Sequence, residues 1–337
     1  MAKSMEAGPQ APLRLAEIKR GASPVDATPS AALWDIGDGV LALEIATRLN
    51  QCDEAVVELL SRTPDRVREG FRAVVIGSDD PRAFSAGATL DVFIEGVERR
   101  EWRRIEGFLR DGQAALLALR YADFPVVAAV HGLTLGGGCE LMLHTDAVVA
   151  CQDLRIGFPE RWIGAVPGWG GVTQTLRRWQ ARLPASEAAR RALEVIAAAT
   201  IFPAQDAFAA GLLGEGDVVI EDRAALLAAA RGRAVALAEG YAPPPPATIA
   251  ALGSSRRAEL EPDLERLSAE NAFAEADRNA ARALAGILCG GGAELGARLS
   301  EDDVMALERE AFLRLIRHPD ALERMRHLRS TGRPLRP

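Results

Sequence analysis

The spacing of hydrophobic and polar residues predicts a mixed α/β protein. Residues 32–45, ALWDIGDGVLALEI, have near-alternating apolar positions around a turn at Gly37–Gly39, which predicts a β-hairpin. Short β-rich runs follow at residues 71–78, 125–132, 146–151 and 154–158. A helical period over residues 98–120 lies between the first two runs, and a strand, a helix and a strand in this order indicate α/β organisation.

Beyond about residue 170 the pattern becomes almost continuously helical. It predicts helices at residues 172–179, 186–198, 204–211, 222–239, 256–288, 301–317 and 319–329. A proline run in YAPPPPATIAALGSS (241–255) interrupts them and favours an extended spacer. We therefore predict a loose N-terminal lead-in (1–29), a β/α core (30–240), and a proline-containing linker with a helical C-terminal part (241–337).

Composition and charge narrow the class of protein. The chain has 337 residues, of which 48% are hydrophobic and 26% charged, as is typical of a soluble globular enzyme. A formal net charge of −7 argues against nucleic acid as a partner. The N-terminus lacks the apolar stretch of a secretory signal, no segment approaches a transmembrane span, and the four cysteines form no metal-binding pattern. We expect a cytoplasmic protein with free thiols, no membrane insertion and no bound metal.

Three glycines precede a carboxylate in LGGGCELMLH (135–144), directly after a strand-like run. Glycines between a strand and a helix bring backbone N–H groups close to a ligand, and the positive end of the helix points to the same place. Glu140 follows Gly137 by three residues, so one helical turn carries its carboxylate to that face. The alternative interpretation is a helix start made easier by glycine, with an acidic residue in the first turn.

Two further segments add candidate chemistry. FSAGATL (84–90) offers a second backbone N–H for a substrate oxygen, because Ala86, Gly87 and Ala88 are small. FPERWIGAVPGWGG (158–171) supplies a second carboxylate, Glu160, followed by a Pro-Gly turn.

Together these three segments resemble the enoyl-CoA hydratase/isomerase superfamily, also called the crotonase superfamily. The resemblance runs from about Ala32 to the C-terminus, and AQDAFAAGLL (204–213) matches the pattern that follows the family's core. The last residues, 307–337, resemble the end of the hydratase part of long-chain bifunctional hydratase/3-hydroxyacyl-CoA dehydrogenases. No G-x-G-x-x-G loop accompanies it, so we expect this sequence to lack the dehydrogenase half.

The resemblance implies a fold, an activity and an assembly. The fold would be the repeated ββα core of crotonase-like (ClpP/crotonase) proteins with a helical C-terminal part. The activity would be enoyl-CoA hydratase, a lyase of fatty acid metabolism that adds water to a trans-2-enoyl-CoA and gives a 3-hydroxyacyl-CoA. Coenzyme A would belong to the acyl-CoA substrate, no separate cofactor would be needed, and the chain would form a homotrimer or a dimer of trimers.

The resemblance also implies roles for individual residues. The backbone N–H groups of Ala88 and Gly137 would hold the thioester oxygen, Glu140 and Glu160 would handle the water and the proton, and Gly168 would offer a further N–H. The residues expected to contact the substrate are Ala86, Gly87, Leu90, Gly136 and Trp169.

Some alternatives stay open at the level of sequence. The alternative interpretation of Glu160 is a solvated acid at a strand end, neutralised by Arg161, and an inward-pointing Arg161 guanidinium would lower the pKa of Glu160 and weaken it as a proton donor. Trp169 either shapes the acyl pocket or packs outward against the helix at 172–179. Thr89 and Asp91 depart from the family pattern, so the coenzyme A phosphates need other partners, for which the candidates are Arg62, Arg66 and Arg82. The competing functions are an enoyl-CoA isomerase or acyl-CoA hydrolase on the same scaffold, and a non-catalytic acyl-CoA-binding subunit.

A second glycine cluster, CGGGAELGAR (289–298), is interpreted as a helix end and a loop. It follows a long helical period, and Ser300 after it is a suitable N-cap, so Glu294 is not a catalytic candidate. His131, His144 and Cys139 are expected to have packing or supporting roles.

Overall fold

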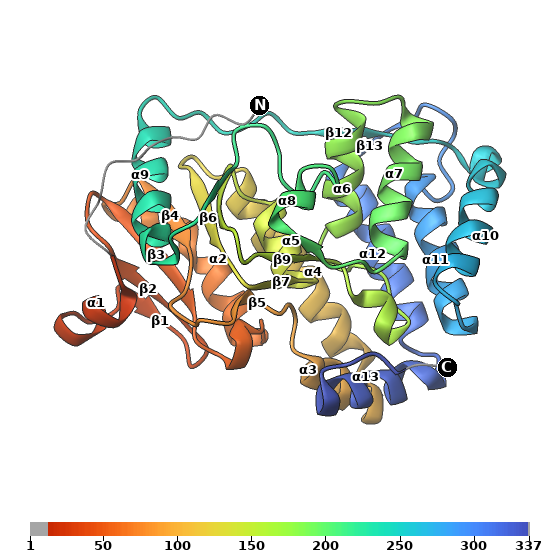
Figure 1. Cartoon of the computed structure of the whole chain (residues 1–337), viewed down its shortest axis with the longest axis horizontal. Coiled ribbons are helices and arrows are strands. Elements are labelled where there is room, and N and C mark those ends of the chain that lie inside the picture. Colours follow the sequence, from red (N-terminus) through yellow and green to blue (C-terminus); the bar gives the residue numbers. More distant parts are fainter. Residues whose placement is uncertain (1–12, 336–337) are drawn as a thin grey trace. The chain divides into compact units, whose positions relative to one another are not determined.

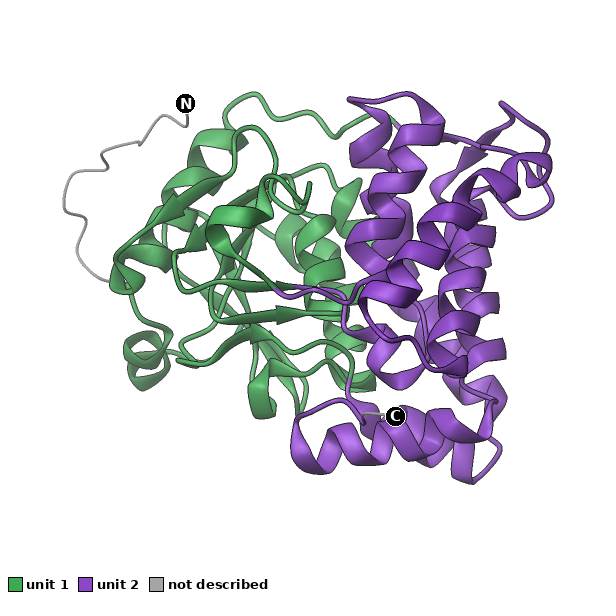
Figure 2. Ribbon diagram, turned by 45° about the vertical axis from the view of Figure 1, so that its right-hand side comes forward, with its two compact units in different colours: residues 1–88, 114–156, 202–245 green, residues 89–113, 157–201, 246–337 purple. Residues whose placement is uncertain are grey.

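The computed structural model describes residues 13–335, which form two compact units, each assembled from three stretches of the chain (Figure 2). Unit 1 comprises the described residues up to Ala88, together with Ala114–Ile156 and Phe202–Pro245. Unit 2 comprises Thr89–Gln113, Gly157–Ile201 and the described residues from Pro246 onward. The range 30–240 that the sequence predicts as one core therefore contains parts of both units, because the chain passes between them several times.

A seven-stranded sheet forms the centre of unit 1, with the strand order β1-β2-β3-β4-β6-β8-β11. Each neighbouring pair from β3 to β11 in this order is parallel, and the pairs β1–β2 and β2–β3 are antiparallel. The bounds are β1 Asp26–Ala27, β2 Ala31–Asp35, β3 Val40–Ile45, β4 Ala73–Ile76, β6 Val126–Val130, β8 Ala147–Cys151 and β11 Val218–Ile220.

Burial on both faces explains why the central strands are legible in the sequence. Every residue of β3, β4, β6 and β8 is buried, and parallel strands covered on both faces read as continuous apolar runs. The predicted hairpin is also confirmed, because β2 pairs with β3 across the turn at residues 36–39. Gly37 and Gly39 have φ of +86° and +71° there, a region that favours glycine.

Helix α9 (Leu226–Ala238) covers one face of this sheet (Figure 1). Its Leu227, Ala230 and Ala234 belong to one buried cluster with alternate residues of the central strands, such as Val75 and Val127. Alternation places these residues on the same face of the sheet. The helix predicted at residues 222–239 is therefore confirmed, with a 3-10 turn, η3 (Arg223–Ala225), at its start.

The N-terminal part of the described chain is more ordered than the sequence predicts. Helix α1 (Leu15–Gly21) and strand β1 lie within the range 1–29, where we expect a loose lead-in. Leu15 is fully buried in the cluster under α9, so burial of one side chain ties this segment to the sheet. Residues 1–12 of the predicted lead-in lie outside the described residues.

A smaller four-stranded sheet has the strand order β10-β9-β7-β5, and two of its strands directly precede the glycine-containing segments of the candidate site. Its strands are β5 Ala83–Ser85, β7 Leu133–Leu135, β9 Arg155–Gly157 and β10 Phe202–Pro203. Strands β5 and β7 run parallel and end just before the FSAGATL and LGGG glycines. The remaining elements of unit 1 are η1 Arg48–Asn50, α2 Glu54–Arg68, α5 Gly137–Leu143 and α8 Ala204–Ala207.

Unit 2 is mainly helical. It contains α3 Leu90–Glu98, the first part of α4 (Trp102–Arg120), η2 Glu160–Ile163, α6 Gly171–Gln180, α7 Ala185–Ala197, η4 Ser254–Leu260, α10 Glu261–Glu270, α11 Glu275–Leu288, α12 Glu301–Leu315 and α13 Pro319–Thr331. Strands β12 (Thr248–Ala250) and β13 (Arg298–Ser300) pair antiparallel. Among residues 13–335, no helix combines the length and the apolar character needed to cross a membrane.

The single helix predicted at residues 256–288 is wrong. Three elements, η4, α10 and α11, occupy this range, and the chain leaves the helix between α10 and α11. Ala272 has a φ of +50°, and the Phe273 side chain that follows is 5% exposed. Burial of Phe273 thus accompanies a break that the helical period does not reveal.

Glu308 on α12 ties α12 to the start of α6. Its carboxylate accepts hydrogen bonds from the Gly170 backbone N–H (2.8 Å), the Thr173 backbone N–H (2.6 Å) and the Thr173 hydroxyl (2.5 Å). Glu308 is 0% exposed, and these backbone groups are the donors that the first turn of a helix leaves without partners. A residue of α12 therefore caps α6 from a distance of 135 positions in the sequence.

We predict that Glu308→Ala lowers the free energy of unfolding by about 3 kcal/mol, because three buried donors lose their acceptor. Denaturant unfolding followed by circular dichroism measures the change. Glu310→Ala is the matched control, since Glu310 lies on the same helix but is exposed, and it should cost less than about 0.5 kcal/mol. Equal losses in the two variants would contradict the capping role.

Candidate active site

The glycine cluster after β7 starts helix α5 and holds its first residues in a buried position. Gly136 is the N-cap of α5, with φ +51° and ψ −122°, a conformation that glycine tolerates and residues with a Cβ do not. Glu140 lies in the first turn and is 2% exposed, and its backbone N–H donates to the Gly136 carbonyl oxygen at 2.8 Å. The predicted helix start with a carboxylate in its first turn is confirmed.

The segment Ala86–Ala88 lies directly against this helix start. A Cβ added to Gly87 would lie 2.7 Å from the Leu135 carbonyl oxygen and 2.9 Å from the Gly137 nitrogen. The Gly87 carbonyl oxygen accepts a hydrogen bond from the Cys52 N–H at 2.8 Å, and Ala88 forms an isolated bridge with Cys52. The two segments whose N–H groups we expect to bind the thioester oxygen are therefore in contact.

Two side chains that the sequence analysis does not single out hold this segment in place. The Ser85 hydroxyl donates to the Asn50 carbonyl oxygen at 2.7 Å and accepts from the Gly87 N–H at 3.1 Å. The Asn50 side-chain amide donates to the Ala83 carbonyl oxygen at 2.8 Å. Both side chains are buried. Ser85 lies in a stretch of small and apolar residues (83–88), but Asn50 lies among polar residues, so its role leaves no trace in the sequence.

The second carboxylate and the Pro-Gly turn belong to unit 2. Glu160 begins the 3-10 turn η2, and its side chain is partly exposed. Gly168 is buried, and its carbonyl oxygen accepts a hydrogen bond from the Gln113 side chain on α4 at 2.8 Å. Gln113 also donates to the Met305 carbonyl oxygen at 2.8 Å and accepts from Arg309, so it joins the turn to α12. Sequence reasoning missed Gln113, because its partners lie 55 and 192 positions away.

Trp169 packs inward against α4 and is 3% exposed. Its ring and that of Phe108 pack in an edge-to-face arrangement with centroids 5.1 Å apart, and a Cβ on Gly112 would lie 2.2 Å from the indole nitrogen. The alternative in which Trp169 packs outward against the helix at 172–179 is therefore wrong. The other alternative, that the indole shapes the acyl pocket, stays a prediction.

The predicted site residues fall into two groups. Ala86, Gly87, Ala88, Gly136, Gly137 and Glu140 lie in unit 1, where the structure brings them together. Leu90, Glu160, Gly168 and Trp169 lie in unit 2. Leu90 is the first residue of α3, whose N-cap is Thr89. That Glu140 and Glu160 face each other stays a prediction.

Arg161 binds partners within unit 2. Its guanidinium lies 3.5 Å from the Asp277 carboxylate, donates to the Ala198 carbonyl oxygen at 3.1 Å, and stacks 4.4 Å above the centre of the Phe273 ring. Burial lowers the pKa of Arg161 below its ordinary value, and Asp277 opposes this effect.

With this geometry established, comparison with known proteins identifies the family. A model of the enoyl-CoA hydratase/isomerase family matches residues 36–280. The chain belongs to this family. A Bacillus subtilis (strain 168) protein named "Probable 3-hydroxyacyl-CoA dehydrogenase" is 28% identical over 330 residues, covering 96% of this chain and 41% of that protein. The chain thus spans less than half the length of this relative.

Solved structures of other hydratase/isomerase proteins have the same fold. The enoyl-CoA hydratase from Bacillus halodurans matches with a TM-score of 0.61 at 15% identity, covering 89% of this chain and 100% of that one. An enoyl-CoA hydratase/isomerase from Xanthobacter autotrophicus Py2 matches with a TM-score of 0.60 at 19% identity, covering 91% and 95%. The predicted crotonase-like α/β fold is confirmed.

The thiols of this hydratase/isomerase family member are buried. All four cysteines are free, and Cys139 is fully buried next to Glu140, as expected of a packing residue. Burial raises the pKa of Cys52 to about 12, and the nearby carboxylates of Asp53 and Glu140 add to this effect. A thiol held in its neutral form is a poor nucleophile, so Cys52 does not compete for the role of reacting group.

The histidines have structural partners. His131 is fully buried and lies 2.7 Å from the Asp80 carbonyl oxygen, and His144 lies 2.7 Å from the Glu140 carbonyl oxygen. Within the described part of the chain, no group of three or more His, Cys, Asp or Glu side chains is arranged to hold a metal ion.

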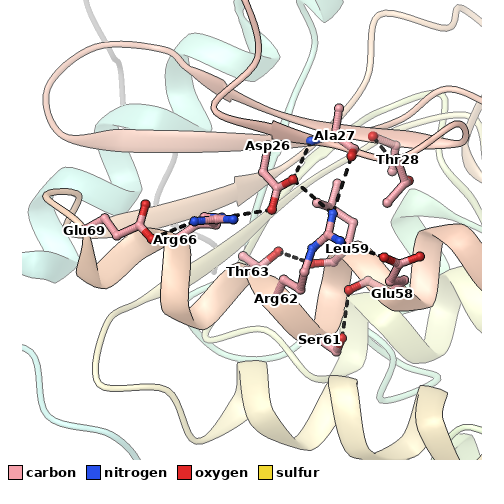
Figure 3. A network of polar contacts seen from close by, with 11 residues as sticks. Asp26, Ala27, Thr28, Glu58, Leu59, Ser61, Arg62, Thr63, Arg66 and Glu69 are labelled. Carbon is pink, nitrogen blue, oxygen red and sulfur yellow. Dashed lines mark hydrogen bonds and ion pairs between the residues drawn. The ribbon is translucent and has the colours of Figure 1, made fainter.

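The arginines considered for coenzyme A phosphates are already paired with carboxylates. Arg62 and Arg66 on α2 bind the two oxygens of Asp26 at 3.0 and 2.9 Å (Figure 3). Arg62 also binds Glu58 on α2, and Arg66 binds Glu69 at the C-cap of this helix. Three carboxylates thus surround two guanidinium groups, which disfavours a phosphate there. Arg82 binds Asp80 at 2.9 Å.

The close contact between Gly112 and the Trp169 indole leads to a further prediction. Gly→Ala inside a helix is ordinarily stabilising by about 1 kcal/mol, but here the new methyl group would overlap the indole. We expect Gly112→Ala to lower the free energy of unfolding by about 2 kcal/mol. Gly107→Ala on the same helix is the control, since its Cβ would meet only Arg110 at 3.9 Å, and it should stabilise. In a Trp169→Ala background the loss at Gly112 should disappear; a loss that persists would contradict the contact.

The Asp26 network predicts a dependence of stability on pH. Burial acts to raise the pKa of Asp26, but the hydrogen bond from Arg66 and the charges of Arg62 and Arg66 outweigh it, so the pKa lies below its ordinary value. A carboxylate with a lowered pKa stabilises the fold above its unfolded pKa and loses this contribution as the pH falls through the folded pKa. The stability difference between wild type and Asp26→Asn should therefore be present at pH 7 and shrink below about pH 4. Asp65→Asn, an exposed change on α2, is the control; a constant difference for Asp26→Asn would contradict the assignment.

Proposed function

We propose that the chain is an enoyl-CoA hydratase that adds water across the 2,3 double bond of a trans-2-enoyl-CoA. The observation that carries this proposal is the contact between the Gly87–Ala88 segment and the start of α5, which carries the buried carboxylate of Glu140. Neither the Ala88 N–H nor the Gly137 N–H donates to a residue that the structure describes. These two neighbouring backbone N–H groups would both donate hydrogen bonds to the thioester oxygen of an acyl-CoA.

The amide pair would stabilise the charge that develops during addition. When the oxygen of water bonds to C3, the π electrons of the double bond move toward the thioester oxygen, which becomes enolate-like. Donors already in place beside that oxygen cost no reorganisation, and loss of one such donor typically costs about 3 to 4 kcal/mol of transition-state stabilisation. Backbone amides need no side chain, which fits the small residues at positions 86–88 and 136–138.

The two carboxylates would handle the protons. One accepts a proton from the water as its oxygen bonds to C3, and the other delivers a proton to Cα as the enolate collapses. The product is a 3-hydroxyacyl-CoA: the hydroxyl on C3 comes from the water, the other proton of the water passes to one carboxylate, and the second, protonated carboxyl group supplies the proton on Cα. We assign these proton transfers to Glu140 and Glu160. Gly168, which would offer a further N–H, and Trp169, which would contact the substrate, lie in the segment that follows Glu160.

The expected substrate is an acyl-CoA thioester, and the expected assembly is a homotrimer or a dimer of trimers. Both follow from family membership and stay proposals. Light scattering after size-exclusion chromatography would measure the assembly directly.

We predict that Glu140→Gln and Glu160→Gln each lower kcat for hydration by about 10² to 10⁴-fold, because a positioned acid or base contributes about this much. The KM should change little, since the backbone amides stay in place. The assay follows the loss of the conjugated thioester absorbance of a 2-enoyl-CoA.

Glu294→Gln is the matched control, because it makes the same chemical change after the second glycine cluster, at an exposed position. If the protein isomerises a 3-enoyl-CoA without hydrating it, or hydrolyses the thioester, the proposed hydratase activity is wrong and the chain is an isomerase or an acyl-CoA hydrolase on the same scaffold. Tight coenzyme A binding with none of these reactions would instead indicate a non-catalytic subunit.

A further inference from the structure

The turn that carries Glu160 is short and holds few bonds of its own. Within η2 and its end, the backbone bonds are Trp162 N–H to the Pro159 carbonyl oxygen at 2.8 Å, Gly164 N–H to Arg161 at 2.9 Å, and Ala165 N–H to Glu160 at 3.0 Å. The turn ends at Gly164, with φ +74°. One 3-10 turn is too short to be stable alone, so its conformation depends on what surrounds it.

A buried cluster of three charged side chains lies against this turn. Arg324 on α13 binds the Asp277 carboxylate at 2.8 Å, and Arg161 of the turn lies 3.5 Å from the other carboxylate oxygen. Arg324 also donates to the Arg161 carbonyl oxygen at 3.5 Å, the upper limit for such a bond. The side chains of Arg161, Asp277 and Arg324 are 14%, 7% and 8% exposed.

Asp277 connects this cluster to the start of α11. Its Oδ2 atom accepts the Ala274 N–H at 2.9 Å, so one carboxylate binds the first turn of a helix and two guanidinium groups. A buried ion pair rarely adds much net stability, because removing the charges from water offsets their attraction. Such a cluster does, however, favour one geometry over others, since any displacement leaves a buried charge without its partner.

We infer that Asp277, together with Arg324, is a positioning residue that fixes the η2 turn and thereby the Glu160 carboxylate. The inference rests on the proposed function only for the role of Glu160; the anchoring of the turn is a separate claim. Arg161 adjoins Glu160 in the sequence, and the cluster binds Arg161 through both its side chain and its carbonyl oxygen. Without the Asp277 charge, the buried guanidinium groups of Arg161 and Arg324 would repel each other, and Arg161 directly follows Glu160 in the chain.

Asp277→Asn tests the inference, because asparagine has the same size and can still accept the Ala274 N–H. Hydrogen–deuterium exchange of the peptide covering residues 158–166 reports the anchoring of the turn whether or not the protein is active. We expect exchange there to be about tenfold faster. With a 2-enoyl-CoA substrate, kcat should fall about tenfold or more while KM changes less than about twofold, since a small displacement of a reacting group affects the chemical step.

Asp263→Asn is the matched control. Asp263 pairs with Arg190 and Arg266 at 3.5 Å in the same unit, and its side chain is 21% exposed. Both kcat and the exchange of residues 158–166 should stay unchanged in this variant. Arg324→Lys is the second test if Asp277→Asn does not fold: it keeps the charge but replaces the guanidinium, whose Nη1 atom contacts both Asp277 and the Arg161 carbonyl oxygen, by an ammonium group on a flexible stem. It should change exchange and kcat in the same direction by a smaller factor.

The outcomes separate the two claims. If exchange of residues 158–166 is unchanged in both Asp277→Asn and Arg324→Lys, the anchoring is overturned. If exchange is faster in these variants but kcat is unchanged, the positioning role is overturned. A wild-type protein that does not hydrate the substrate overturns the proposed function and with it the catalytic role of the turn, while the exchange measurement still decides the anchoring.

Discussion

Close contact between two backbone segments is the constraint on which the proposed chemistry depends. A Cβ on Gly138 would lie 2.3 Å from the Ser85 carbonyl oxygen, and a Cβ on Gly87 would lie 2.9 Å from the Gly137 nitrogen. No side chain fits at either place, so the contact requires glycine on both sides. It brings the start of α5, and with it Glu140, against the segment that ends at Ala88. The buried Ser85 and Asn50 hold that segment by two long-range hydrogen bonds, and Ser85 also accepts the N–H of the nearby Gly87.

The fold could be predicted from the sequence where strands are buried along their whole length and where a helix begins with a typical capping residue. The central strands appear as unbroken apolar runs, and Ser300 caps α12 through its hydroxyl, as predicted. Helix α2 was not predicted, because Pro64 lies inside it and removes a backbone donor. Helix α3 was also missed. Of the smaller sheet, only β9 was predicted, by the run at residues 154–158; strands β5, β7 and β10 were missed, since three residues or fewer give a strand no recognisable period.

The candidate site was predictable only where its chemistry is local. The glycines and Glu140 lie within a few residues of one another, so their spacing could be interpreted directly. Contacts between distant residues leave no such pattern: Gln113 meets the carbonyl oxygen of Gly168 from 55 positions away. The inward packing of Trp169 likewise depends on the absence of a side chain at Gly112, which only the structure reveals.

The capping of α6 by a residue 135 positions later has a consequence for how the protein is made. A ribosome completes α6 long before it reaches α12, and in that interval the amide groups of residues 170 and 173 have only solvent or transient partners. Unit 2 cannot reach its final form until nearly the whole polypeptide has been synthesised, because its three stretches are spread along the chain. Nascent chains that stop before residue 308 would therefore be natural targets for chaperones and proteases.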